Sequence, residues 1–143
     1  MATRHLCRIL VLQSLYEWSF WGYPEGKEDE ILDRNLEEFG NDIDEPEFAR
    51  KILKGVAKNL EFIDGKIGSN TRSIQFEQIS LLEKNILRLA VYELCFQKHE
   101  EVPQKVAINE AVELAKNFAS DGAAKFINAV LGSIYDETMA NAE

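Results

Sequence analysis

Residues Val102–Leu131 read VPQKVAINEAVELAKNFASDGAAKFINAVL, and this stretch predicts two helices separated by a short break. In the first helix, apolar side chains at steps of three and four residues share one face: Ile108, Ala111, Val112, Ala115 and Phe118. Pro103 suits the first helical turn, where its missing N–H costs nothing. Residues 120–122 interrupt the pattern, and Asp121 is a good N-cap for a final helix. That helix is expected to bury Phe126, Ile127, Val130, Leu131 and Ile134.

Helical periodicity also accounts for most of the remaining sequence, and we find no alternating strand pattern or internal repeat. The segment 4–20 is apolar around much of its circumference, so we expect a central helix there. The other predicted helices are Glu28–Phe39, a helix from Pro46 that Gly65, Gly68 and Ser69 end, and a segment from about Gln78 to Cys95. The sequence therefore predicts an all-α helical bundle, with one domain over residues 1–143.

The acidic charge of the chain is concentrated in one segment. The formal net charge of the 143 residues is −9, which at first argues against a nucleic-acid partner. Residues 25–50, however, hold eleven acidic and three basic side chains, a balance of −8. The remaining residues are nearly neutral, so a basic surface elsewhere is compatible with the composition.

Several classes of function find no support in the sequence. No window approaches the roughly 20 apolar residues that cross a bilayer, and no cleavable signal pattern opens the chain. Cys7 and Cys95 are isolated, which is typical of buried thiols in a reducing cytosol. The two histidines, His5 and His99, lack the spacing of a helical zinc site, and no phosphate loop or nucleophile elbow is present. We therefore expect neither catalysis nor a cofactor.

Four segments of the chain are distinctive as blocks: VAINEAVELAK (Val106–Lys116), KFINAVL (Lys125–Leu131), ILRLAVYEL (Ile86–Leu94) and, less strongly, LQSLYEW (Leu12–Trp18). These blocks resemble the NusB family of bacterial transcription antitermination factors. The order and spacing of these blocks fit the family from end to end. The resemblance implies the NusB-like fold, in which two small helical bundles pack as one domain.

The same resemblance implies a non-enzymatic RNA-binding adaptor in the bacterial cytoplasm. Members of the family pair with NusE, a ribosomal protein of the small subunit, and the pair binds the single-stranded boxA element of nascent ribosomal RNA. The complex then joins other Nus factors on RNA polymerase and suppresses termination. Whether the free protein is a monomer or a homodimer is open at this point.

The first predicted helix carries the main candidate RNA site. Arg4 and Arg8 are four residues apart, with His5 and Tyr16 in the same broad sector. Cations can hold phosphates while an aromatic ring stacks on a base. The alternative is that the arginines are ordinary surface charges and Tyr16 is part of the core. In NusB proteins the first helix opens with an arginine-rich run that contacts RNA; here that run is thinned to two arginines, whose side chains we expect to face solvent.

Other candidate residues lie further along the chain. Lys125 and Phe126 open the last predicted helix, where the positive end of the helix dipole favours a phosphate. The resemblance places Glu83 where NusB proteins meet their ribosomal-protein partner. Arg88 and Glu93 are expected to pair with each other or with neighbouring helices. A second basic stripe needs no function beyond a solvated face and consists of Lys51, Lys54 and Lys58.

Two other functions compete with antitermination. NusB-like domains also precede the catalytic half of some ribosomal RNA cytosine methyltransferases, but that activity needs a downstream Rossmann-like domain, which we do not expect after Glu143. A helical protein-interaction module with little or no RNA binding is favoured by the thinned arginine run and the acidic second helix. Titration with boxA RNA distinguishes this module from an RNA-binding factor.

Overall fold

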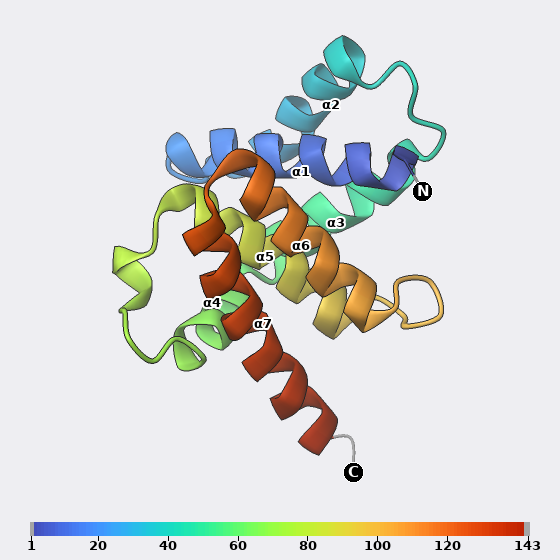
Figure 1. Cartoon of the computed structure of the whole chain (residues 1–143). Coiled ribbons are helices and arrows are strands. Elements are labelled where there is room, and N and C mark those ends of the chain that lie inside the picture. The colour runs from blue at the N-terminus through green and yellow to red at the C-terminus, as the bar shows by residue number, and fades with distance from the viewer. Residues whose placement is uncertain (1, 142–143) are drawn as a thin grey trace. The chain divides into compact units, whose positions relative to one another are not determined.

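A computed structural model of the chain describes residues 2–141, and every regular element in that range is helical (Figure 1). The all-α prediction is confirmed. The helices form two compact units, Met1–Lys58 and Asn59–Glu143. The first unit contains α1 (Ala2–Phe20), α2 (Lys27–Phe39) and α3 (Pro46–Lys58). The second contains α4 (Leu60–Ser69), the 3-10 turn η1 (Phe76–Gln78), α5 (Leu81–Phe96), α6 (Gln104–Phe118) and α7 (Asp121–Asn141).

In the first unit, α1 packs against both α2 and α3, as expected of a central helix. Its fully or nearly buried apolar residues are Cys7, Leu10, Val11, Leu12, Leu15 and Trp18. A buried polar chain joins α1 to α2, because Asn35 donates to Ser14 Oγ at 2.9 Å and Ser14 Oγ donates to the Leu10 carbonyl at 2.7 Å. Each of these buried polar groups is satisfied, which is a condition for a stable core.

In the second unit, α5 packs against α4, α6 and α7, and α6 and α7 pack against each other. Two charged residues of α5 are buried in this unit, Arg88 (2% exposed) and Glu93 (0% exposed). The contacts of Arg88 join two helices. Its guanidinium donates to both carboxylate oxygens of Asp64 on α4, at 2.8 and 2.9 Å, and to Asn85 at 3.0 Å. Arg88 therefore pairs with a neighbouring helix, one of the two expected arrangements. A bidentate pair of this kind fixes the position of α4 on α5.

Three local predictions need correction. The predicted long helix from Pro46 is two helices, because Asn59 leaves helical geometry (φ −112°, ψ 22°), and α4 then continues through Gly65 and Gly68. The apolar steps continue across this break, so periodicity did not reveal it. The N-cap of α7 is Ser120, whose Oγ accepts the Ala123 N–H at 3.0 Å, and not Asp121. Phe126 is half-buried rather than part of the core.

Loss of Arg88 should destabilise the protein strongly. In Arg88→Ala the Asp64 carboxylate keeps its charge but loses its bidentate partner, which typically costs about 3 kcal/mol. We expect that decrease in the free energy of unfolding, measured by urea denaturation followed by circular dichroism. The control is Lys54→Ala on the exposed face of α3, which should change stability by less than about 0.5 kcal/mol. Equal urea midpoints of unfolding for Arg88→Ala and Lys54→Ala would contradict the structural role of Arg88.

Candidate nucleic-acid interface

The two arginines of α1 both pack on one aromatic ring. The guanidinium carbons of Arg4 and Arg8 lie 4.4 and 5.2 Å from the centroid of Phe48 on α3. Arg4 Nε also contacts Glu45 Oε2 at 3.4 Å, and its side chain is 28% exposed. Arg8 is only 3% exposed. A planar guanidinium over an aromatic face is favourable when it is shielded from water, so both groups have a structural reason to lie there.

The expectation that both arginines face solvent is therefore wrong for Arg8. Arg4 and Arg8 are one helical turn apart, on the side of α1 that packs against α3. Sequence spacing shows that two side chains share a face, but it does not show whether a neighbouring helix covers that face. Of the two arginines, Arg4 retains the larger surface for contact with a phosphate.

The exposed side of α1 carries the other two candidates. Tyr16 is 41% exposed, so the alternative that assigned it to the core is wrong. His5 is partly exposed. Because His5 and Tyr16 are eleven residues apart, close to three whole turns, they project in nearly the same direction. Gln13 is exposed between them. This side of α1 can therefore present a ring and polar groups to a ligand.

The remaining candidates belong to the second unit. Lys125 is exposed and Phe126 is half-buried in the first turn of α7. Glu83 lies in the first turn of α5, where its backbone N–H donates to Ser80 Oγ at 3.2 Å. The Ser80 hydroxyl in turn donates to Glu83 Oε2 at 2.8 Å. Glu83 thus orients the hydroxyl of the N-cap residue Ser80, besides the role in partner binding that the resemblance implies.

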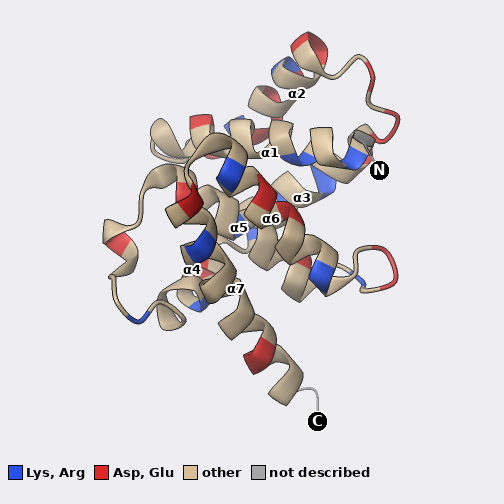
Figure 2. Cartoon of the chain, viewed as in Figure 1, with Lys and Arg blue, Asp and Glu red and all other residues tan. Residues whose placement is uncertain are grey.

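Charge is unevenly distributed within the first unit. Figure 2 shows acidic residues on α2 and on the loop that follows it, and basic residues on the N-terminal half of α1 and on α3. The lysine stripe of α3 is exposed, as expected: Lys51, Lys54 and Lys58. Two of the arginines in this unit are held by acidic partners across helices, Arg34 by Glu17 and Arg50 by Asp33. Nearby carboxylates therefore compete with any phosphate for the cations that remain at the surface.

The cysteines show no sign of chemical activation. Both Cys7 and Cys95 are free thiols. Burial raises the pKa of each thiol, which keeps it protonated and poorly nucleophilic. Over residues 2–141, side chains of the metal-binding types form no cluster of three or more. Within the same range, none of the helices combines the length and the apolar character needed to span a bilayer.

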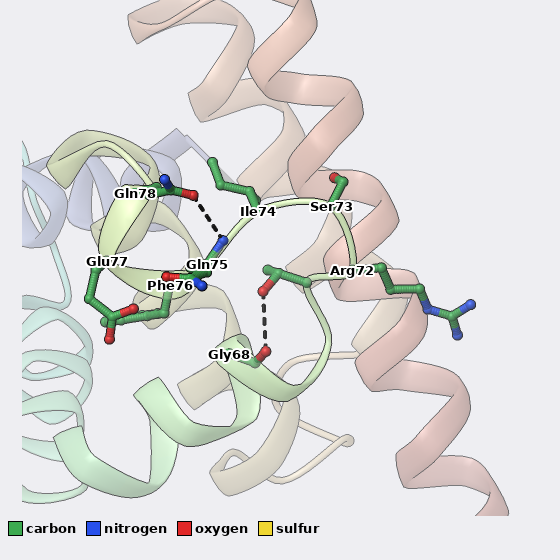
Figure 3. A pocket seen from close by; sticks show the side chains of 9 residues that line it. Gly68, Arg72, Ser73, Ile74, Gln75, Phe76, Glu77 and Gln78 are labelled. Carbon is green, nitrogen blue, oxygen red and sulfur yellow. Dashed lines mark hydrogen bonds between the residues drawn. The ribbon is translucent and has the colours of Figure 1, made fainter.

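An open pocket of about 490 Å³ in the second unit was not anticipated from the sequence (Figure 3). It is lined by the segment 71–78 between α4 and α5, together with Gly68. Its shape depends on two hydrogen bonds, from Thr71 Oγ1 to the Gly68 carbonyl at 3.2 Å and from the Gln75 N–H to Gln78 Oε1 at 3.3 Å. The lining is mostly neutral and polar, and it does not group titratable side chains as a catalytic site would.

Comparison with known proteins identifies the family. A model described as the NusB family matches residues 5–136, which extend from α1 into α7. The chain belongs to the NusB family. The transcription antitermination protein NusB of Aliarcobacter butzleri is 41% identical over 134 residues, 94% of this chain and 98% of the relative. NusB of Dehalococcoides mccartyi strain CBDB1 is 38% identical over 132 residues, 92% of this chain and 89% of that protein.

Solved structures agree with the NusB-like fold. The structure of T. maritima NusB has a TM-score of 0.83 and 33% sequence identity, covering 94% of this chain and 91% of that one. A chain in the crystal structure of the antitermination factors NusB and NusE in complex with dsRNA also has a TM-score of 0.83, with 28% identity. That match covers 96% of this chain and 98% of the other. The prediction of the fold family is confirmed.

The burial of Arg8 leads to a prediction about stability. Arg8→Ala removes a buried guanidinium and its stem from the Phe48 ring, and the loss of packing should lower the free energy of unfolding by about 2 kcal/mol. A lower midpoint in thermal denaturation would show this effect. The matched control is Arg72→Ala, because Arg72 is exposed on the segment between α4 and η1. If both variants melt like the wild type, Arg8 does not stabilise the unit.

Proposed function

We propose that this chain is a bacterial, cytoplasmic transcription antitermination factor that binds RNA together with NusE. The supporting observation is that a chain with the same fold occurs in the solved complex of NusB, NusE and dsRNA, and that this match covers 96% of the present chain. Membership of the NusB family over residues 5–136 supports the same proposal. The proposed role requires binding surfaces only, and we assign it no cofactor and no chemical step.

The RNA that we propose is the single-stranded boxA-type element of ribosomal RNA transcripts. Arg4 and Lys125 contact phosphates, because both retain exposed surface. Tyr16 and Phe126 offer rings to unpaired bases, and His5 supplies a polar contact beside them. Arg8 contributes to the site mainly by holding the Phe48 ring on which Arg4 also packs.

NusE provides the affinity that this site lacks. A protein with few phosphate contacts binds RNA weakly and with a shallow dependence on salt. A second protein that binds both this chain and the RNA strengthens the complex by thermodynamic linkage. Other Nus factors and RNA polymerase then join the assembled complex. We place Glu83 at the NusE contact, where its carboxylate is partly exposed beside Ser80.

A helical module that binds proteins and has little RNA affinity is the second candidate. The observation in its favour is the state of the arginines, since Arg8 is buried and Arg4 contacts Glu45. The acidic segment 25–50 would also repel a phosphate backbone. Titration with boxA RNA, with and without NusE, separates the two candidates. Absence of RNA binding in both titrations would favour the protein-binding module.

The salt dependence of RNA binding should report the role of Arg4. Each phosphate neutralised on a single strand contributes about 0.7 to the slope of log affinity against log salt. Arg4→Ala should therefore flatten that slope by about 0.7, measured by fluorescence anisotropy with labelled boxA RNA over a series of salt concentrations. Arg72→Ala is the control for loss of one exposed arginine and should leave the slope unchanged. An unchanged slope in Arg4→Ala would remove Arg4 from the RNA site.

Charge reversal at Glu83 should weaken NusE binding. A like charge brought against a basic partner costs a few kcal/mol, so Glu83→Arg should raise the dissociation constant at least about tenfold by calorimetry. Because Glu83 also accepts a hydrogen bond from Ser80, the control is Ser80→Ala, which removes the cap and keeps the charge. Equal weakening in both variants would mean that helix capping, and not charge, carries the effect.

A further inference from the structure

Two large aromatic side chains are exposed where α1 ends. Phe20 is 62% exposed and Trp21 is 68% exposed. Their ring centroids are 5.3 Å apart and their planes meet at 88°. Rings of this size are usually buried, and neighbouring exposed rings commonly mark a binding surface. Neither ring is needed for the packing of α1, which is already buried through Leu15 and Trp18.

A closed helix terminus holds this aromatic pair in place. The Tyr23 N–H donates to the Trp18 carbonyl at 2.9 Å and the Gly22 N–H donates to the Ser19 carbonyl at 3.0 Å. With Gly22 in the left-handed region (φ 85°), this is a Schellman motif. The Trp18 indole N–H donates to the Pro24 carbonyl at 2.9 Å, and the Tyr23 ring packs edge-on against Trp18 at 5.1 Å. The exposed rings therefore project from an ordered turn.

The aromatic pair continues the exposed side of α1. Phe20 follows Tyr16 by four residues, so the two rings lie on the same side of the helix, one turn apart. Tyr16 is 41% exposed, and Gln13 is exposed one turn earlier. The side of α1 that begins with His5 therefore becomes increasingly aromatic toward its C-terminal end.

We propose that Phe20 and Trp21 extend this surface as a stacking platform for unpaired bases of the bound RNA strand. The inference rests on the proposed function, because it assigns further residues to the same RNA site. The charges nearby favour bases over phosphates: Glu25 is exposed in the turn, and the cation Arg34 is already held by Glu17. Stacking on a ring needs no cation and tolerates any base, so it suits an acidic neighbourhood that phosphates avoid.

Loss of both rings should weaken RNA binding without changing its salt dependence. The double variant Phe20→Ala/Trp21→Ala should bind single-stranded boxA RNA about tenfold more weakly, which corresponds to the loss of about one stacked base. Its slope of log affinity against log salt should match that of the wild type, because no phosphate contact is lost. The matched control is Phe39→Ala, which removes an exposed ring (54%) from α2 of the same unit and should bind as the wild type does.

Tryptophan fluorescence gives a second measurement on the same titration. The chain has two tryptophans, of which Trp18 is 5% exposed and Trp21 is 68% exposed. Stacking on a base should therefore quench mainly Trp21, and Trp21→Phe should abolish most of the quenching. Trp21→Phe should also bind RNA more tightly than Trp21→Ala, because phenylalanine keeps a ring in place. Circular dichroism of each variant verifies that the helices are intact.

The outcomes distinguish this inference from the proposed function. If the wild type binds RNA and the double variant binds equally well, the platform is excluded and the RNA site stands without it. If the double variant loses affinity for NusE in the absence of RNA and keeps its affinity for RNA, the rings form a protein contact and the inference is overturned. If the wild type binds no RNA with or without NusE, the proposed function itself fails, and the platform fails with it.

Discussion

The burial of α1 between α2 and α3 determines what the first unit can present to a ligand. A helix that packs on two neighbours keeps only a narrow exposed side, so each residue of α1 serves either the core or the surface. The guanidinium groups of Arg4 and Arg8 pack on Phe48 of α3, whereas Tyr16 and Phe20 lie on the solvent-exposed side of α1. These two arginines thus pack within the unit, whereas the two rings lie on the exposed side of α1.

This division has consequences for affinity. In the proposed RNA site, Arg4 must leave Glu45 before its charge can neutralise a phosphate. A ring that is already exposed and ordered does not have to break an ion pair before it can stack on a base. In the proposed RNA site, stacking therefore contributes more than charge, and the proposed partner supplies part of the electrostatic attraction. A net charge of −9 is compatible with that arrangement.

Sequence patterns predicted the helices better than they predicted the exposed surface. The periodicity of residues 102–131 predicted α6 and the start of α7 within a few residues, because an apolar face repeats wherever a helix packs. The same argument missed the break at Asn59, where the apolar steps continue although the backbone leaves helical geometry. It also predicted wrongly that Arg8 faces solvent, because the contact between Arg8 and Phe48 on α3 depends on tertiary packing. The pattern placed Phe20 at the end of the predicted helix 4–20, but periodicity does not show that the rings of Phe20 and Trp21 are exposed.

Glu83 has a local role at a helix terminus and a proposed role at the NusE contact. The first turn of α5 needs an acceptor near its unpaired N–H groups, and the Ser80–Glu83 hydrogen bonds supply it. The same placement brings a negative charge to the positive end of a helix dipole, where it is stable without a buried counterion. A carboxylate held in this way is pre-positioned, so a basic partner loses little entropy in ordering it. Helix capping therefore explains why an acidic residue is tolerated at this position, and the same hydrogen bond orders the carboxylate for the proposed partner.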